Sequence, residues 1–115
     1  MQFTMIIKTS RKAESNPPQP HLIEQMDRYN DLLEAANVRV MAKGLYPDSE
    51  GVKIQFLNPL QSPIVTYGPF LHDQNQVAGF FIIDVENKEE ALQWLLKAPD
   101  PQGFGEGEIE LRQIR

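Results

Sequence analysis

The sequence predicts a single α+β domain in which two helices cover one face of an antiparallel sheet. Three observations support this fold class. Segments with the two-residue period of strands are interspersed with two amphipathic helical segments, and their order divides the chain into two strand–helix–strand halves. Such halves are typical of the ferredoxin-like βαββαβ arrangement, here with an additional hairpin strand. The 115 residues suit one domain, 1–115, because domains most often contain about 100–150 residues.

The first half begins with a strand and a helix. Residues 2–9 alternate and predict a strand whose buried face carries Phe3, Met5 and Ile7. Residues 10–19 are polar and proline-rich, and we expect a loop there, because proline removes a backbone donor. Residues 20–36 have apolar residues at helical spacing and predict an amphipathic helix. Pro20 suits its first turn, and Asn37 tolerates the left-handed conformation that ends helices.

The middle of the chain predicts three further strands. Residues 38–46 and 52–58 both have strand character, and the turn formers between them predict that the two strands form a hairpin. A short strand follows at 64–67. Residues 68–78 fit no period, and we expect a loop.

The second half closes the domain. Residues 79–85 are apolar on both sides, which predicts a strand that is covered on both faces. Residues 87–98 predict the second helix, with Asn87 as its cap and Glu90 at the capping-box position. Residues 108–114 predict the last strand.

The second face of the sheet leads to a prediction of assembly. Right-handed connections place both helices on one face, and we expect the opposite face to carry Ile6, Phe81, Ile83 and Val85. A monomer rarely exposes an apolar patch above a few hundred Å². We therefore predict a homodimer through the sheet face. The alternatives are that the strand faces are assigned the wrong way round, or that residues 68–78 fold across the sheet.

Composition excludes several classes of protein. The net charge of -5 disfavours unspecific binding to nucleic acid or anionic membranes, so we expect neither as a partner. The chain has no cysteine, which excludes disulfides, thiolate metal sites and cysteine nucleophiles. With only two histidines, we expect no metal site and no cofactor. Neither a membrane span nor a secretory leader is recognisable, and we expect a cytoplasmic protein.

A set of short motifs runs through the chain in a characteristic order. They are Met1–Lys8, Tyr29, Leu45 with Pro47, Tyr67-Gly68-Pro69-Phe70, Gly79–Val85, Glu90-Ala91-Leu92-Gln93-Trp94, Pro99 and Glu108–Arg112. In order and spacing they resemble the YCII-related family, specifically its DGPF branch. The resemblance covers essentially the whole chain and implies a dimeric α+β barrel, but it implies little chemistry.

The chain departs from this family pattern at one turn and the loop after it. Tyr67 stands where the family has an aspartate, and His72, Gln74 and Asn75 stand where it usually has charged residues. The resemblance therefore implies that any activity of the family's polar loop is altered or lost here.

Candidate site residues lie in and near this loop. His72 with Asp73 is the best candidate for catalysis, because a histidine oriented by a carboxylate transfers protons near neutral pH. Adjacent side chains rarely point at each other, so Asp84 or Asp31 would suit His72 better. A solvated loop explains the same residues. His21 is best explained as a surface residue, and Lys43 as a solvated side chain unless it faces a cleft.

Two classes of function follow. The first is a small-molecule binding or enzymatic domain whose cleft lies between the sheet and the first helix, is covered by residues 67–76, and is lined by Tyr29, Tyr67 and His72. Buried aromatic packing is the more common role of such tyrosines. The second class is a non-catalytic dimeric module with a regulatory or assembly role. Convergent polar side chains in the cleft would favour the first class, and a filled interior the second.

Overall fold

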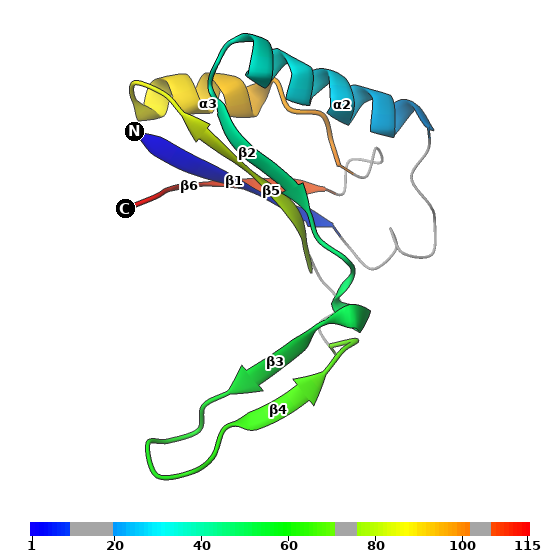
Figure 1. The fold of residues 1–115 in the computed structure, drawn as a ribbon, viewed down its shortest axis with the longest axis vertical. Coiled ribbons are helices and arrows are strands. Elements are labelled where there is room, and N and C mark those ends of the chain that lie inside the picture. Colours follow the sequence, from blue (N-terminus) through cyan, green and yellow to red (C-terminus); the bar gives the residue numbers. More distant parts are fainter. Residues whose placement is uncertain (10–19, 71–75, 102–106) are drawn as a thin grey trace.

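A computed structural model describes residues 1–9, 20–70, 76–101 and 107–115, shown in Figure 1. The elements, in chain order, are β1 (Gln2–Thr9), α2 (Pro20–Ala35), β2 (Arg39–Gly44), the 3-10 helix η1 (Asp48–Glu50), β3 (Val52–Gln55), β4 (Ile64–Tyr67), β5 (Gln76–Asp84), α3 (Lys88–Leu96) and β6 (Glu108–Gln113). The predicted loop at 10–19 lies outside the described residues. No helix of the described ranges is long and apolar enough to cross a membrane.

The main sheet confirms the predicted fold class. Its four strands lie in the order β2-β5-β1-β6, and every neighbouring pair is antiparallel. This is the order of a ferredoxin-like βαββαβ domain. β1 is central, with Met5 opposite Phe81 of β5 and opposite Leu111 of β6. The strand predicted at 79–85 begins three residues earlier, at Gln76.

Both helices lie on the same face of this sheet (Figure 1). Their ends follow the predicted signals: α2 begins at Pro20, and Asn37, two residues after its end, has a φ of 59°. The Asn87 side chain caps α3 by accepting a hydrogen bond from the Glu90 amide at 2.8 Å. The core between helices and sheet consists of Phe3, Met5, Tyr29, Leu33, Val38, Phe81, Ile83, Val85 and Ala91.

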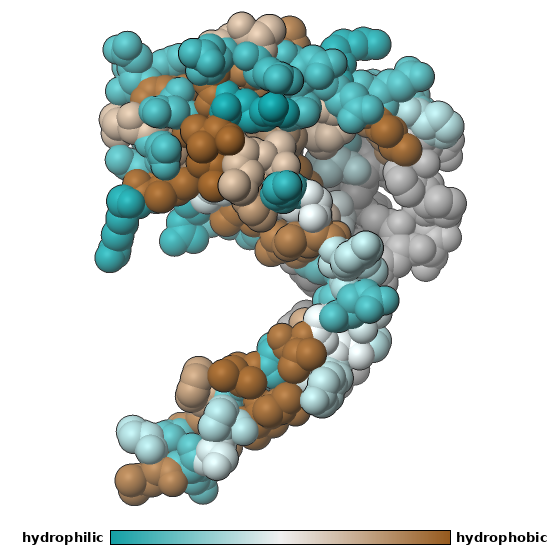
Figure 2. All heavy atoms as spheres, viewed as in Figure 1, coloured by the Kyte–Doolittle hydropathy of each residue, from teal (hydrophilic) through white to brown (hydrophobic). Residues whose placement is uncertain are grey.

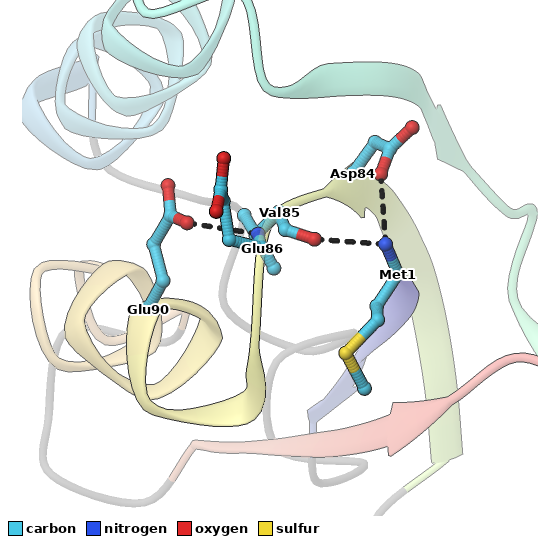
Figure 3. Close-up of polar contacts among 5 residues, drawn as sticks. All are labelled: Met1, Asp84, Val85, Glu86 and Glu90. Atoms are coloured by element: carbon cyan, nitrogen blue, oxygen red, sulfur yellow. Dashed lines mark hydrogen bonds and ion pairs between the residues drawn. The ribbon is translucent and has the colours of Figure 1, made fainter.

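A small polar cluster joins the end of β5 to the start of β1 and to α3 (Figure 3). The amino group of Met1 donates to the Val85 carbonyl at 2.8 Å and to Asp84 Oδ1 at 3.2 Å. The Glu90 carboxylate accepts a hydrogen bond from the amide of Glu86, the residue before the Asn87 cap, at 2.9 Å, whereas the capping box would use the amide of Asn87 itself.

The structure corrects the predicted faces of β5. Phe81, Ile83 and Val85 were expected on the uncovered face, but each is at most 5% exposed and packs beneath the helices. The register explains this, because Phe81 lies opposite Met5 and Ile83 opposite Phe3, and all share the helix-covered face. The uncovered face instead carries the alternate residues of β5, Phe80 and Ile82.

We call this uncovered side of the main sheet the open face. Its apolar centre is formed by Ile6, Phe80 and Ile82, which are half-buried, and by Met41 at the edge of the sheet. On β6 the face becomes charged: Glu110 forms ion pairs with Lys8 at 2.5 Å and with Arg112 at 3.1 Å. Hydrogen bonding to Lys8 lowers the pKa of Glu110, and the same bond raises the pKa of Lys8.

The predicted hairpin between 38–46 and 52–58 is wrong. β2 pairs with β5, whereas β3 pairs with β4 in a separate two-stranded sheet. Pro47 and the 3-10 helix η1 redirect the chain after β2, so that β3 leaves the main sheet. We call residues 52–67 the arm and the rest of the domain the body. The arm projects from the body and extends below its sheet in the view of Figure 1.

Candidate functional site

A cleft of about 360 Å³ lies between α2 and the end of the main sheet. It agrees with the predicted position between the sheet and the first helix. Its wall on the helix side is apolar and consists of Leu22, Ile23 and Met26. The sheet adds Ile7 and Phe81, and Pro101 also contributes to the apolar lining. The cleft is therefore a mainly apolar site, as small-molecule sites usually are.

The floor of the cleft is open because its residues are small. Ala42, Gly44, Ala78 and Gly79 line it, from the paired ends of β2 and β5. A Cβ added at Gly79 would meet the Lys43 carbonyl oxygen at 2.6 Å, so only glycine fits there. A Cβ added at Gly44 would have no atom within 4 Å. The strand ends thus leave a space that larger side chains would occupy.

Polar side chains are few in this cleft. Thr9 contributes a hydroxyl, Asp27 a carboxylate and Asn30 an amide. Arg39 orients Asn30 by donating a hydrogen bond from Nη1 to Asn30 Oδ1 at 3.0 Å, and Arg39 also contacts Glu34 at 3.4 Å. Asn30 can therefore offer a ligand its NH₂ group as a donor and the second lone pair of Oδ1 as an acceptor.

Lys43 and Phe80 also border the cleft, but not with their side chains. The two residues are opposite each other in the β2–β5 register, one position away from Ala42 and Phe81. Successive side chains of a strand point to opposite faces, so Lys43 and Phe80 point to the open face. Lys43 is exposed there, in agreement with a solvated side chain.

Tyr29 does not line the cleft. It is 3% exposed, its hydroxyl donates to the Trp94 carbonyl oxygen at 2.7 Å, and its ring contacts Phe81 edge-to-face with centroids 5.6 Å apart. Burial raises the pKa of Tyr29 to about 12. The structure thus gives Tyr29 a packing position between α2, α3 and the sheet.

The other predicted site residues that the structure describes are not brought together. Tyr67 lies at the end of the arm strand β4 and is 74% exposed. His72 and Asp73 lie outside the described residues, and so does half of the predicted cover at 67–76, namely 71–75. Of the carboxylates considered for His72, Asp84 contacts the amino group of Met1, whereas Asp31 is exposed on α2. His21 is exposed in the first turn of α2, where a surface residue was expected.

Sequence reasoning missed the residues that form the cleft. Asp27 and Asn30 were assigned only to a helix, and Gly44 and Gly79 only to strands. A signal was present for the glycines, since glycine within a strand often marks close approach of another group. Their meeting across the β2–β5 pair depended on a strand pairing that the sequence analysis placed elsewhere.

Comparison with known proteins identifies the family but no activity. No curated protein matches the chain. The family model described as "YCII-related domain" matches residues 1–115. The chain therefore belongs to the YCII-related domain family.

Proposed function

We propose that this domain binds a small, mainly apolar molecule in the cleft between α2 and the main sheet. The observation that carries this proposal is the hollow floor, where Ala42, Gly44, Ala78 and Gly79 meet beneath an apolar helix wall. A volume of about 360 Å³ suits a small ligand, since ligand sites commonly measure about 300–1,000 Å³.

The charge of the cleft favours a neutral or cationic ligand. Among the described lining side chains, Asp27 supplies a negative charge, while Thr9 and Asn30 supply uncharged hydrogen-bonding groups. The net charge of the chain, -5, disfavours anions further. An amine or alcohol on an apolar skeleton matches this lining. If the domain also catalyses acid–base chemistry, Asp27 is the carboxylate that the described lining offers for it.

Filling the cleft tests the proposal. Gly44 lies two residues after Ala42, so a side chain placed there points to the same face as Ala42, into the cleft. A thermal-shift screen of small amines, alcohols and matched carboxylates would first identify ligands of the wild type. Gly44→Leu should then abolish binding, because leucine occupies the floor, while Gly44→Ala should weaken it less.

A second variant tests the polar contact. Asp27→Asn should reduce affinity for amines and leave affinity for alcohols of the same skeleton largely unchanged. Far-UV circular dichroism and the melting temperature of each variant serve as fold controls. Ligands that bind Gly44→Leu as tightly as the wild type would show that the binding site lies elsewhere.

A dimeric assembly role is the second function that an observation favours. Ile6, Phe80 and Ile82 form an apolar strip on the open face, and no helix among the described residues covers it. A second copy carries the same strip, and a two-fold axis would bring the two together. We therefore propose that two copies pair through their open faces.

Adjacent substitutions on β5 distinguish this pairing from a defect in folding. Ile82→Asp places a charge on the open face and should give a folded monomer of 13.2 kDa by light scattering. Phe81→Asp places the same charge in the core and should unfold the domain, because Phe81 is 5% exposed. Leu96→Asp, on an exposed part of α3, should leave the dimer intact. A wild-type mass of one chain would refute the pairing.

A further inference from the structure

The arm has one face that is apolar throughout. In the β3–β4 register Val52 lies opposite Tyr67 and Ile54 opposite Val65, and these four side chains share one face. Their exposed fractions range from 51% for Ile54 to 74% for Tyr67. The other face carries Lys53, Thr66, Gln55 and Ile64. The tip adds three more exposed apolar residues: Phe56, Leu57 and Leu60.

Such a pattern belongs to a sheet with one buried face. Alternation of apolar and polar residues arises where one side packs on a core and the other meets solvent. In the described residues no element of this chain packs on the apolar face of the arm, as the exposed fractions of its four side chains show. An isolated two-stranded hairpin is at best marginally stable in water. The described part of the chain therefore leaves this face available for contact with another molecule.

The root of the arm determines where that surface can be. The Gly68 amide donates to the Gly51 carbonyl at 2.8 Å, and the Asp48 amide donates to Gln76 Oε1 at 3.0 Å. A Cβ on Gly68 would lie 1.7 Å from the Asp48 carbonyl oxygen, so the two backbones are in direct contact. Lys53 lies over the Phe70 ring at 4.6 Å from its centroid. These contacts direct the arm away from its own sheet.

Space-filling atoms show the result (Figure 2). A hollow separates the arm from the body, and hydrophobic side chains extend along the arm. The molecule measures 48 Å along its longest axis and 19 Å along its shortest. The arm projects along the longest axis. The hollow lies on the side of the open face, away from the helices.

We infer that in the dimer proposed above the arm of each copy packs its apolar face onto the other copy, at the open-face side of the partner's β2 edge. Val40 and Met41, at a bulge on this edge strand, are 50% and 42% exposed. They are more exposed than the half-buried Ile6, Phe80 and Ile82 at the centre of the open face. They thus form an apolar border beside the sheet-to-sheet contact.

Area favours a second copy as the occupant. A stable interface buries roughly 800 Å² per partner, from about 20–30 residues, which the three central side chains of the open face do not supply. Two exchanged arms and two β2 edges extend the contact toward that size. The net charge of -5 makes two copies repel each other, so their contact has to gain its stability from buried apolar area. The apolar face of the arm carries no charge, because Lys53 lies on the other face.

Neighbouring residues of β3 provide a matched pair of variants. Ile54→Asp places a charge on the apolar face of the arm, and Gln55→Asp places the same charge on the opposite face. By sedimentation equilibrium, Ile54→Asp should raise the dissociation constant of the dimer at least tenfold, while Gln55→Asp should change it by less than threefold. Circular dichroism should show the body folded in both.

Disulfide trapping tests the contact even if Ile54→Asp unfolds the arm. The chain has no cysteine, so any disulfide formed between two single-cysteine variants must join the introduced residues. Val65→Cys mixed with Met41→Cys should give a disulfide-linked heterodimer on oxidation, identified by peptide mass. Thr66→Cys, on the opposite face of the arm, should cross-link to Met41→Cys at a much lower yield.

The inference rests on the proposed pairing, yet the two fail differently. If Ile82→Asp dissociates the dimer while Ile54→Asp and the Val65 cross-link behave like their controls, the pairing stands and the arm contact is refuted. If the wild type is a monomer at all concentrations, both are refuted, and the arm then serves a different partner. Ligand binding in the cleft is measured separately and does not depend on either outcome.

Discussion

Replacing Tyr29 by phenylalanine should weaken the fold by a small and calculable amount. The substitution keeps the edge-to-face contact with Phe81 but removes the hydroxyl that donates to the Trp94 carbonyl at 2.7 Å. That carbonyl still accepts a hydrogen bond from the Lys97 amide at 3.1 Å, so it does not become unsatisfied. The loss is therefore that of one ordinary hydrogen bond, about 0.5–1.5 kcal/mol in the free energy of unfolding at neutral pH.

The same substitution should change the alkaline limit of stability. Burial raises the pKa of Tyr29 from 10.0 to about 12, so the folded state retains the phenol proton more tightly than the unfolded state. The stability that the protonated Tyr29 contributes to the fold is complete below pH 10 and is lost as the pH rises toward 12. At about 1.4 kcal/mol per pKa unit, the free energy of unfolding of the wild type should fall by roughly 2–3 kcal/mol over this pH range. Tyr29→Phe should not show this decrease.

Urea unfolding at pH 8, 10 and 11.5, followed by circular dichroism, measures both effects. The wild type should be the more stable protein at pH 8, and the order should reverse by pH 11.5. Tyr46 and Tyr67 are 87% and 74% exposed and are present in both proteins, so the comparison isolates Tyr29. Stability curves that stay parallel across this pH range would refute the assigned environment of Tyr29.

Three further predictions concern the root of the arm, a helix cap and an ion pair. Gly68→Ala should lower the free energy of unfolding by about 1–3 kcal/mol, as for overpacking, because its Cβ would meet the Asp48 carbonyl; a melting curve identical to the wild type would contradict this. Asn87→Ala should cost about 1 kcal/mol through loss of the α3 cap, and Asn87→Ser should restore most of it. The pKa of Glu110 is lowered by Lys8, so the stability from this pair is present above the usual pKa of a glutamate and is lost as the pH falls. Glu110→Gln should accordingly reduce the difference in stability between pH 7 and pH 3, measured by urea unfolding, and an unchanged difference would contradict the assignment.

Local signals in the sequence identified most elements. The alternation of Phe3, Met5 and Ile7 predicted β1, and helical spacing predicted α2. Asn37 and Asn87 marked a helix end and a helix start for reasons that depend on a single residue's backbone or side chain. These predictions succeeded because capping and periodicity are short-range effects.

The cleft could be predicted only in outline. Its position between sheet and first helix follows from the fold class, but its lining depends on contacts between distant segments. Gly44 and Gly79 form its floor because β2 pairs with β5, and Tyr29 is excluded from it because Trp94 offers its hydroxyl a partner. The glycines signal a close approach, but neither they nor Tyr29 indicate in the sequence which distant segment is the partner.

The sequence by itself determined the family, the order of strands and helices, and the fact that β5 is apolar on both sides. Tertiary structure decided which side of β5 the helices cover and which strand pairs with β3. The physical reason is that a two-residue period separates the faces of a strand without saying which face is buried, and strand pairing joins residues far apart in the chain. For β5, the register with β1 places Phe81 in the core and leaves Ile82 on the open face.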